Sequence, residues 1–181
     1  MIQSTFDLWS RGGFDAITLQ AVADRAEVSL KTVVRHFGTK EGLLTACMEV
    51  SVTREEGARE VAAGDIAGVV AVLSQRYEAM ADYVVRNAEM EFRYPVMGAW
   101  VARTRASHKD WLARAFAPWL PPEGPVREQR LMALYWATEI RSWWAVRHAF
   151  GQDLATAQAV LLSLLEALVA QWGAPLSRST P

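Results

Sequence analysis

Two cationic side chains stand one helical turn apart in the segment SLKTVVRHF, which covers residues 29–37. On a helix, Lys31 and Arg35 would point to the same side, with Thr32 beside them. Lys and Arg bind phosphate oxygens and guanine edges, and a threonine hydroxyl can bond to a base or a phosphate. The spacing therefore predicts a face suited to duplex DNA, although a polar face with two cations is more often simply solvated surface.

The sequence gives less support for a catalytic or metal-binding site than for a DNA-binding face. Ser107, His108 and Asp110 are close in the chain, but neighbouring residues on a helix point apart, and no other partner for a hydrolytic triad is evident. Cys47 lies among apolar residues and is expected to be buried. One cysteine rules out an internal disulfide, and the three histidines lack metal-ligand spacing. An enzyme is the main rival class, but we expect no catalysis, no metal and no cofactor.

Short helices must position the cationic face. A first helix is predicted over about residues 2–11, ending at two glycines. Thr18 can cap a second helix that ends near residue 26, and Ser29 can cap a third that ends near residue 37. Thr39 can cap a fourth that continues to about residue 63. A short helix set across a tight turn from its predecessor is the helix-turn-helix arrangement, whose second helix enters the major groove.

The third of these helices is predicted to have one buried and one exposed side. Its apolar residues are expected to form a small core with the second helix, made of Val22, Ala23, Ala26, Leu30, Val33 and Phe37. The three polar residues Lys31, Thr32 and Arg35 then point outward, with Val34 and His36 at the flanks. Lys40, at the start of the fourth helix, can meet the DNA backbone beside the groove.

The rest of the chain is also predicted to be helical, because β-branched residues never alternate over the length of a strand. Long helices are expected over about residues 66–87, 126–150 and 154–172. The predicted fold class is therefore all-α. A three-helix helix-turn-helix DNA-binding domain over residues 1–46 is followed by a helical effector-binding and dimerisation domain over residues 47–181.

Residues 2–44 closely resemble the tetracycline-repressor (TetR) family of bacterial transcriptional regulators. The matching stretch is GFDAITLQAVADRAEVSLKTVVRHFGTKEGLL, which follows the family pattern at constant spacing from Gly13 to Leu44. The resemblance implies a sequence-specific DNA-binding regulator, most simply a ligand-released repressor that acts as a homodimer on a palindromic operator. An activator, or a regulator without a ligand, is the alternative that the sequence leaves open.

The resemblance also assigns roles to individual residues. The phosphate-contacting roles carry over to Thr18, His36 and Lys40, and the base-reading positions fall on the outward-facing residues of the third helix. Together with the helix cap and the flanking valine, the predicted DNA-binding residues are Thr18, Ser29, Lys31, Thr32, Val34, Arg35, His36 and Lys40.

Two residues depart from the family pattern. The family usually has glycine in the turn where this chain has Glu27, and a positive φ there would cost on the order of 1–2 kcal/mol. It usually has tyrosine where Val34 stands, so a hydroxyl that often meets a phosphate is absent, while methyl groups remain that can touch a thymine methyl. We expect either weaker DNA binding or an atypical operator.

Charge and hydropathy set further limits. The formal net charge is −1, so DNA binding must rest on a local cationic face rather than on a global field. The N-terminus lacks the features of a secretory signal, and uncharged stretches such as residues 154–165 are too short to span a bilayer. We expect a cytoplasmic protein with no membrane partner.

The final helix is predicted to carry two apolar stripes, one more than docking on its own core requires. One stripe holds Leu154, Ala157, Leu161, Leu164 and Leu168, and the other holds Leu162, Leu165, Val169 and Trp172. The last two helices also resemble the C-terminal pair of the family, which packs against a second copy. This resemblance is looser than that of the N-terminal residues. The predicted dimer interface consists of Leu154, Leu161, Leu162, Leu165, Leu168 and Val169.

Large, soft side chains are frequent in the middle of the chain. In the family such residues line an effector pocket, and they would suit a small apolar or aromatic effector of unknown identity. Aromatic residues at helical spacing are more often core than pocket. The predicted pocket residues are Tyr77, Met80, Met97, Trp100, Trp136 and Trp143.

Overall fold

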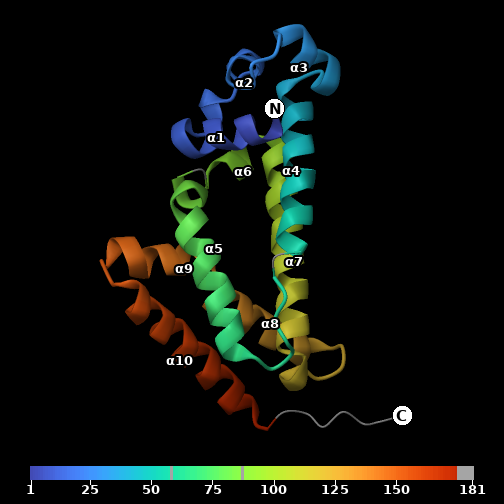
Figure 1. Cartoon of the computed structure of the whole chain (residues 1–181). Helices are drawn as coiled ribbons and strands as arrows, with labels where there is room; N and C mark the ends of the chain where they lie inside the picture. Colours follow the sequence, from blue (N-terminus) through green and yellow to red (C-terminus); the bar gives the residue numbers. More distant parts are fainter. Residues whose placement is uncertain (58, 87, 175–181) are drawn as a thin grey trace. The chain divides into compact units, whose positions relative to one another are not determined.

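The computed structural model describes residues 1–57, 59–86 and 88–174, with the backbone alone described for 51–57. Throughout these ranges the regular elements are helices and none is a strand, so the predicted all-α class is confirmed (Figure 1). The helices are α1 (Ile2–Gly12), α2 (Leu19–Arg25), α3 (Leu30–Phe37), α4 (Lys40–Gly57), α5 (Ile66–Arg86), α6 (Met90–Arg93), α7 (Pro95–Ala115), α8 (Pro125–Ala137), α9 (Ile140–Trp144) and α10 (Leu154–Trp172).

The chain divides into two compact units that interleave along the sequence. The N-terminal unit comprises Met1–Ala58 and Tyr83–Thr104, and the C-terminal unit comprises Arg59–Asp82 and Arg105–Pro181. The N-terminal unit thus includes the end of α5, all of α6 and the first half of α7. The predicted domain boundary after residue 46 stays a prediction, but the compact unit that contains the helix-turn-helix is larger than residues 1–46.

The core of the N-terminal unit forms around α1 and α4. Trp9 is buried and packs against the rings of Trp100, at a centroid distance of 5.5 Å, and Tyr83, at 6.2 Å. Ile17, Val22, Leu43, Leu44 and Met97 complete the same apolar cluster. Cys47 is buried in this cluster, as predicted, and burial raises the pKa of its thiol. This core holds the first four helices in place.

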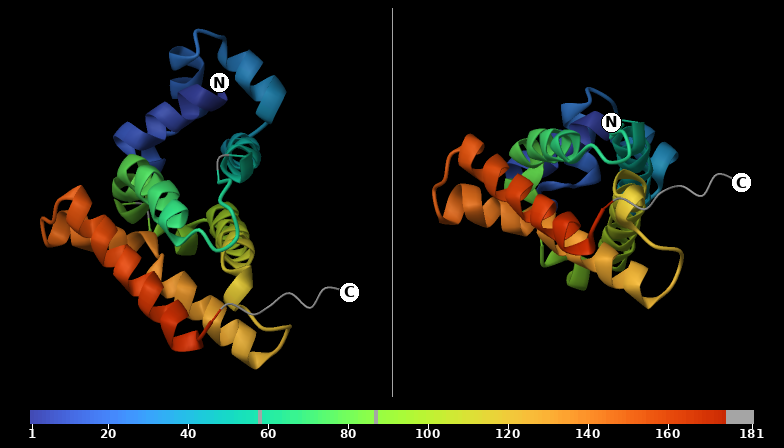
Figure 2. Two further views of the ribbon diagram at one scale, coloured as in Figure 1. Left: turned by 60° about the horizontal axis from the view of Figure 1, so that its bottom comes forward. Right: turned by 90° about the horizontal axis from the view of Figure 1, so that it is seen from below.

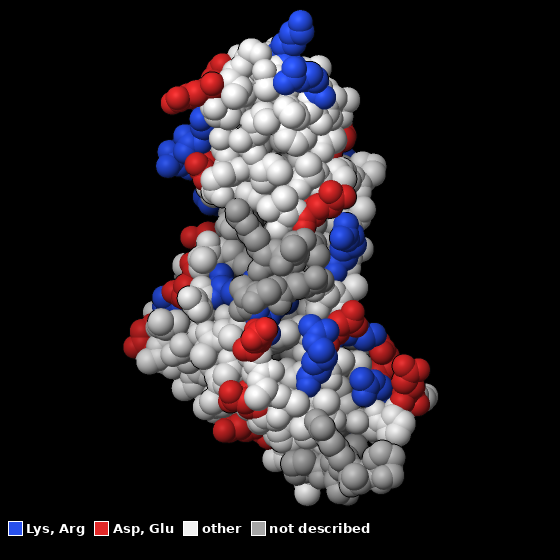
Figure 3. Space-filling view, turned by 45° about the vertical axis from the view of Figure 1, so that its right-hand side comes forward, with Lys and Arg blue, Asp and Glu red and all other residues white. Residues whose placement is uncertain are grey.

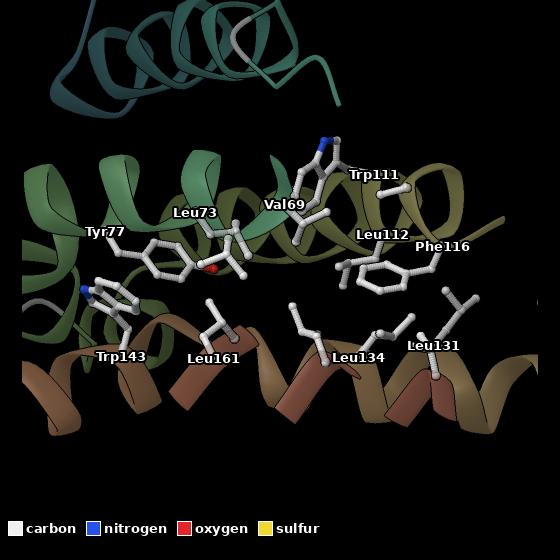
Figure 4. Packing of buried hydrophobic residues seen from close by; sticks show 14 of the residues in the cluster. Val69, Leu73, Tyr77, Trp111, Leu112, Phe116, Leu131, Leu134, Trp143 and Leu161 are labelled. Atoms are coloured by element: carbon white, nitrogen blue, oxygen red, sulfur yellow. The ribbon is translucent and has the colours of Figure 1, made fainter. Parts of the chain in front are cut away.

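The core of the C-terminal unit is built from residues of α5, α7, α8 and α10, together with Trp143 of α9. Figure 4 shows Val69 and Leu73 of α5 opposite Leu134 of α8 and Leu161 of α10, while Phe116 of α7 packs at one end. Within this unit α8 and α10 run side by side in both views of Figure 2. Apolar residues at spacings of three and four produce this packing, because each helix presents one such stripe to the others.

The helix predicted over residues 126–150 is broken, so that prediction is wrong in this respect. α8 ends at Ala137, α9 follows, and a π-helical turn covers Ala145–Ala149. The break lies at Thr138, whose hydroxyl donates to the Leu134 carbonyl at 2.8 Å while its own carbonyl accepts from the Tyr77 hydroxyl at 2.5 Å. The bond from Tyr77, 61 residues away, ties this break to α5. The fourth helix is also shorter than predicted, because α4 ends at Gly57.

Helix α10 buries one stripe rather than two. Ala157, Leu161, Leu165 and Val169 recur every four residues and face the core of their own unit. Over its most apolar 18 residues α10 has a mean hydropathy of 1.6, with only 22% of that window buried. By length and composition this helix could cross a membrane, contrary to the prediction from shorter stretches, but one such helix is weak support for a membrane protein.

Candidate nucleic-acid interface and effector groove

Side-chain caps define the start of both helices of the helix-turn-helix. The Thr18 hydroxyl oxygen accepts from the Ala21 amide at 3.0 Å, and the Ser29 hydroxyl oxygen accepts from the Thr32 amide at 3.1 Å. Each cap satisfies an amide that has no partner within the helix. The Ser29 and Thr32 hydroxyls also bond to each other at 2.9 Å. The predicted caps are confirmed, and they set the boundaries of α2 and α3.

The turn between the two helices places Glu27 in the left-handed region, with φ at 55°. The Val28 amide then donates to the Ala23 carbonyl at 3.0 Å, which closes the turn over the end of α2. An L-residue with a side chain pays a steric cost in this conformation, whereas glycine does not. The departure at Glu27 is therefore a source of local strain.

Helix α3 has a narrower buried side than predicted. Val33 is fully buried, as are Val22 and Ala23 of α2, as expected. Leu30 is 39% exposed, which corrects its assignment to the core. Leu30 is the first residue of α3, a helix of eight residues. With Val34, which is 43% exposed and one turn further on, it forms an apolar strip on the outer surface.

The cations of α3 are exposed beside this apolar strip. Lys31 and Arg35 have no hydrogen bond or ion pair with any residue that the structure describes, and α3 contains no acidic residue. Figure 3 shows Lys and Arg side chains standing out at the end of the N-terminal unit where α2 and α3 lie, with acidic side chains to one side. The arrangement offers two cations and several methyl groups to a partner on one face.

Lys40 plays a structural part that the sequence did not predict. Its ammonium donates to the Phe14 carbonyl at 3.0 Å and lies 4.1 Å from the centroid of the Phe14 ring. Partial burial lowers the pKa of Lys40, and the nearby Asp15 and Glu41 oppose that effect. An ammonium group has three donors, so the predicted phosphate contact remains compatible with the bond to Phe14.

The other predicted DNA-binding residues lie around the same helix pair. Thr18, Ser29 and His36 are exposed, and Thr32 is half-buried. Arg25, a cation of α2, is instead paired with Asp7 of α1 at 2.7 Å, and this bond lowers the pKa of the Asp7 carboxyl. Of the Lys and Arg side chains that the structure describes on α2 and α3, the two without such a partner, Lys31 and Arg35, are both on α3.

A groove opens in the C-terminal unit beside the break between α8 and α9. Its empty volume is about 340 Å³, part of it continuous with solvent, and its walls come from α5, the α8–α9 break and α10. Tyr77 and Trp143 meet at its base, with ring centroids 6.0 Å apart in an edge-on arrangement (Figure 4). Leu161 and Leu164 of α10 supply apolar walls, so the groove suits a small apolar or aromatic molecule.

The structure brings together only part of the predicted effector pocket. Tyr77 and Trp143 line the groove, as predicted for a pocket. Met97 belongs to the apolar cluster of the N-terminal unit and Trp100 packs against it, which corrects their assignment. Trp136 is 74% exposed on α8, because it lies on the side of the helix opposite Leu134. Sequence spacing cannot separate these cases, since all are large apolar residues on helices.

Met80 is half-buried on α5 and does not line the groove. Its sulfur lies 3.7 Å from the Arg76 guanidinium.

The structure buries some of the predicted dimer residues and exposes others. Leu161, Leu165 and Val169 are buried in the core of their own unit, so they are removed from the predicted interface. Leu162 and Leu168 are half-buried against the same core. Leu154 remains exposed. The exposed apolar residues Met132, Trp136, Val160 and Leu164 were not among the predicted dimer residues, because the sequence pattern does not show which side of a helix packs on its own core.

His108 has a structural environment rather than a catalytic one. It is buried, its ring stacks on Trp111 at 5.8 Å, and its Nε2 lies 2.9 Å from the Thr138 hydroxyl oxygen. That hydroxyl gives its own proton to Leu134, so the bonding pattern assigns the donor hydrogen to Nε2. The Arg59 guanidinium lies 3.4 Å from Nδ1. Burial, with help from Arg59, lowers the pKa of His108 to about 3.

In residues 1–57, 59–86 and 88–174, no group of three or more His, Cys, Asp or Glu side chains could hold a metal ion.

Comparison with known proteins identifies the N-terminal region. Residues 2–47 match the family described as bacterial regulatory proteins, tetR family. The match covers the caps, the turn and the exposed face of α3.

Curated relatives extend the similarity over most of the chain. The HTH-type transcriptional repressor KstR of Rhodococcus jostii (strain RHA1) is 24% identical over 171 residues, which cover 91% of this chain and 80% of the relative. The repressor of the same name from Mycobacterium tuberculosis (strain ATCC 25618 / H37Rv) is 26% identical over 170 residues, covering 86% and 74%. That from Mycolicibacterium smegmatis (strain ATCC 700084 / mc(2)155) is 35% identical over 48 residues, covering 26% and 24%.

Proposed function

We propose that this chain, whose residues 2–47 match the bacterial regulatory proteins of the tetR family, is a homodimeric DNA-binding repressor that a small ligand releases from a palindromic operator. These relatives are transcriptional repressors, which favours repression over activation for this chain. A regulator of this kind works in the cytoplasm, where the DNA is. The same relatives favour a regulator over an enzyme.

The observation that carries the proposal is the exposed face of α3. Lys31 and Arg35 are held outward by the burial of Val33 on the opposite side. In a major groove these cations donate to guanine edges or phosphates, and the methyl groups of Leu30 and Val34 can contact thymine methyls. The mixed face supports sequence-specific reading rather than general attraction to phosphate.

A second copy is needed for a palindromic operator, and α10 offers a surface for it. Val160 and Leu164 are exposed on α10, and Met132 and Trp136 are exposed on α8, which packs beside it. Low burial of so apolar a helix within one chain supports cover by another copy. A two-fold pair would have to place its α3 helices about 34–36 Å apart to enter successive major grooves.

The effector would bind in the groove beside Tyr77 and Trp143. A ligand releases the operator only if it prefers the conformation that binds DNA poorly. Shifting the population from 99:1 to 1:99 needs a preference of roughly 5.5 kcal/mol.

The test of the DNA face is a titration of purified protein against DNA from its own promoter region. The double variant K31A/R35A should lose sequence preference and at least about 30-fold in affinity, because it removes two specific contacts that contribute about 1–3 kcal/mol each. The control R114A removes an exposed cation from α7, and it should keep the preference. Selective binding by the double variant would overturn the assignment of α3.

The test of the dimer is sedimentation of wild type and of L164E, which places a charge on the exposed side of α10. Wild type should sediment as a dimer, and the variant should be a folded monomer with weak operator binding. A monomeric wild type at operator-binding concentrations would refute the dimer. The control E166Q changes a charge at an exposed position of the same helix and should leave the dimer intact.

A further inference from the structure

The orientation of one groove wall is set by a residue outside the groove. Trp143 is buried, with its ring against Tyr77, and its indole N–H donates to Glu78 Oε1 at 2.9 Å. Glu78 follows Tyr77 on α5 and is not among the lining residues. A tryptophan ring whose N–H is bonded cannot rotate without losing that bond, so the carboxylate defines where the wall stands.

The same carboxylate holds the π-helical turn. Arg147 donates to it twice, from Nε and Nη2, each at 2.8 Å, and donates from Nη1 to the Gln152 carbonyl. This two-pronged bond lowers the pKa of Glu78. Glu78 therefore accepts three hydrogen bonds, one from the groove wall and two from the turn that follows α9.

A π-helical turn can change to α-helical hydrogen bonding by a shift of one residue. The Phe150 amide donates to the Ala145 carbonyl at 2.9 Å, five residues back, instead of four as in an α-helix. A change of register by one residue turns the following side chains by about 100°, which would carry Arg147 away from Glu78. Such turns are rare and are frequently found at functional sites. The ion pair holds the observed register.

A second pair of bonds lies one turn further along α5. Asp82 accepts from the Trp144 indole N–H at 2.8 Å, and His148 Nε2 lies 3.7 Å from the same carboxyl oxygen. Trp144 does not line the groove. Of these two sets of contacts between described residues of α5 and the α9 region, the one at Glu78 includes a residue that lines the groove.

We propose that Glu78 is the positioning residue of the groove: it fixes the Trp143 wall and links the state of that wall to the register of the π-helical turn through Arg147. A ligand that rotates Trp143 breaks the N–H bond to Glu78 and weakens the hold on the turn. The proposal rests on the ligand-binding role of the groove for its regulatory meaning. α5, which bears Glu78, continues into residues 83–86 of the N-terminal unit.

The experiment uses full-length protein labelled with 5-fluorotryptophan and observed by fluorine NMR, with indole as the probe. The chain has eight tryptophans, and the variants W143F and W144F assign the two signals of interest. In wild type, indole should shift the Trp143 signal in a saturable way and leave the Trp144 signal in place.

The variants E78Q and D82N form the matched comparison. E78Q keeps an amide oxygen for the Trp143 N–H but loses the charge that holds Arg147, so the Trp143 signal should broaden or split without indole. The affinity for indole should change at least about threefold. D82N should alter the Trp144 signal and leave Trp143 and indole binding as in wild type. Circular dichroism melting confirms that each variant is folded, and R147K, which retains the charge, should reproduce a weaker form of the E78Q effect.

The possible outcomes separate the two proposals. A Trp143 signal and an indole affinity that E78Q leaves unchanged would overturn the role of Glu78, whether or not indole binds. If indole leaves Trp143 unaffected in wild type while E78Q still splits its signal, the positioning role stands and the ligand-binding role of the groove fails.

Discussion

The outer face of α3 and the region around Thr138 use similar side chains in opposite ways. On α3, cations and a threonine stand at the surface, and Lys31 and Arg35 have no partner in the described part of the chain. Around Thr138, the polar groups of Tyr77 and His108 bond to the break between α8 and α9. A surface that must bind a partner leaves donors unsatisfied by its own chain, whereas a core that must keep one shape satisfies them internally.

The largest expected difference between the regions is in their response to acid. Because the pKa of buried His108 is about 3, below the usual value of 6.5, the unfolded chain takes up a proton first as the pH falls. The stability due to neutral His108 is fully present above pH 6.5 and is lost progressively toward pH 3. This single group should contribute a slope of about 1.4 kcal/mol per pH unit within that window. Chemical denaturation at several pH values measures the slope.

The variant H108Q tests the source of this slope. Glutamine has no proton to gain in the window, so the variant should lose that part of the pH dependence while it is less stable than wild type at pH 7. An unchanged slope would show that other groups cause the acid sensitivity and that His108 does not separate the two regions.

A smaller effect should come from one chemical change made in both regions. T138V removes a buried hydroxyl that donates to the Leu134 carbonyl and accepts from His108, which leaves both groups without that partner. Unfolding free energy should fall by about 1–3 kcal/mol. T32V removes from the DNA face a hydroxyl whose bond to the exposed Ser29 hydroxyl water can replace, so it should change stability by less than about 0.5 kcal/mol and weaken operator binding roughly tenfold.

Denaturant titrations and operator titrations of both variants would check this contrast. Equal losses of stability in T138V and T32V would contradict the distinction between an internal network and an interface. A T138V protein that binds the operator less tightly despite full folding at working temperature would instead indicate that the break between α8 and α9 influences the DNA-bound state.

The two regions also differ in how far the sequence alone predicted them. Thr18 and Ser29 cap the amides three residues later, and such local bonds are legible from spacing, so α2 and α3 were predicted closely. The break at Thr138 depends on His108 and Tyr77, which are 30 and 61 residues away, so the local sequence does not predict it. For the same reason the contact between Glu78 and Arg147, 69 residues apart, was not predicted.

The sequence also did not predict which apolar residues of the long helices are exposed. Leu164 and Leu165 are adjacent and of one type, yet one is 49% exposed and the other is fully buried. The direction of each depends on which neighbours the helix packs against, and almost every residue of α10 is apolar or small. The all-α class could be predicted from the helical pattern of the sequence alone. The groove and the exposed apolar face could be located only once the packing of the helices was known.

The smallest expected effect is at the turn between α2 and α3. It tests whether the local backbone alone determines the stability of this region. Glu27 has φ at 55°, so E27G should remove a strain of about 1–2 kcal/mol. Glycine also makes the unfolded chain more flexible, which offsets part of that gain, so the melting temperature should rise by only a few degrees. E27A is the control: it shortens the side chain but keeps the Cβ atom that causes the strain, so it should not reproduce the rise. A lower melting temperature for E27G than for wild type would mean that the glutamate side chain stabilises the turn by more than its conformation costs, and the helix-turn-helix would then depend on a contact beyond its local backbone.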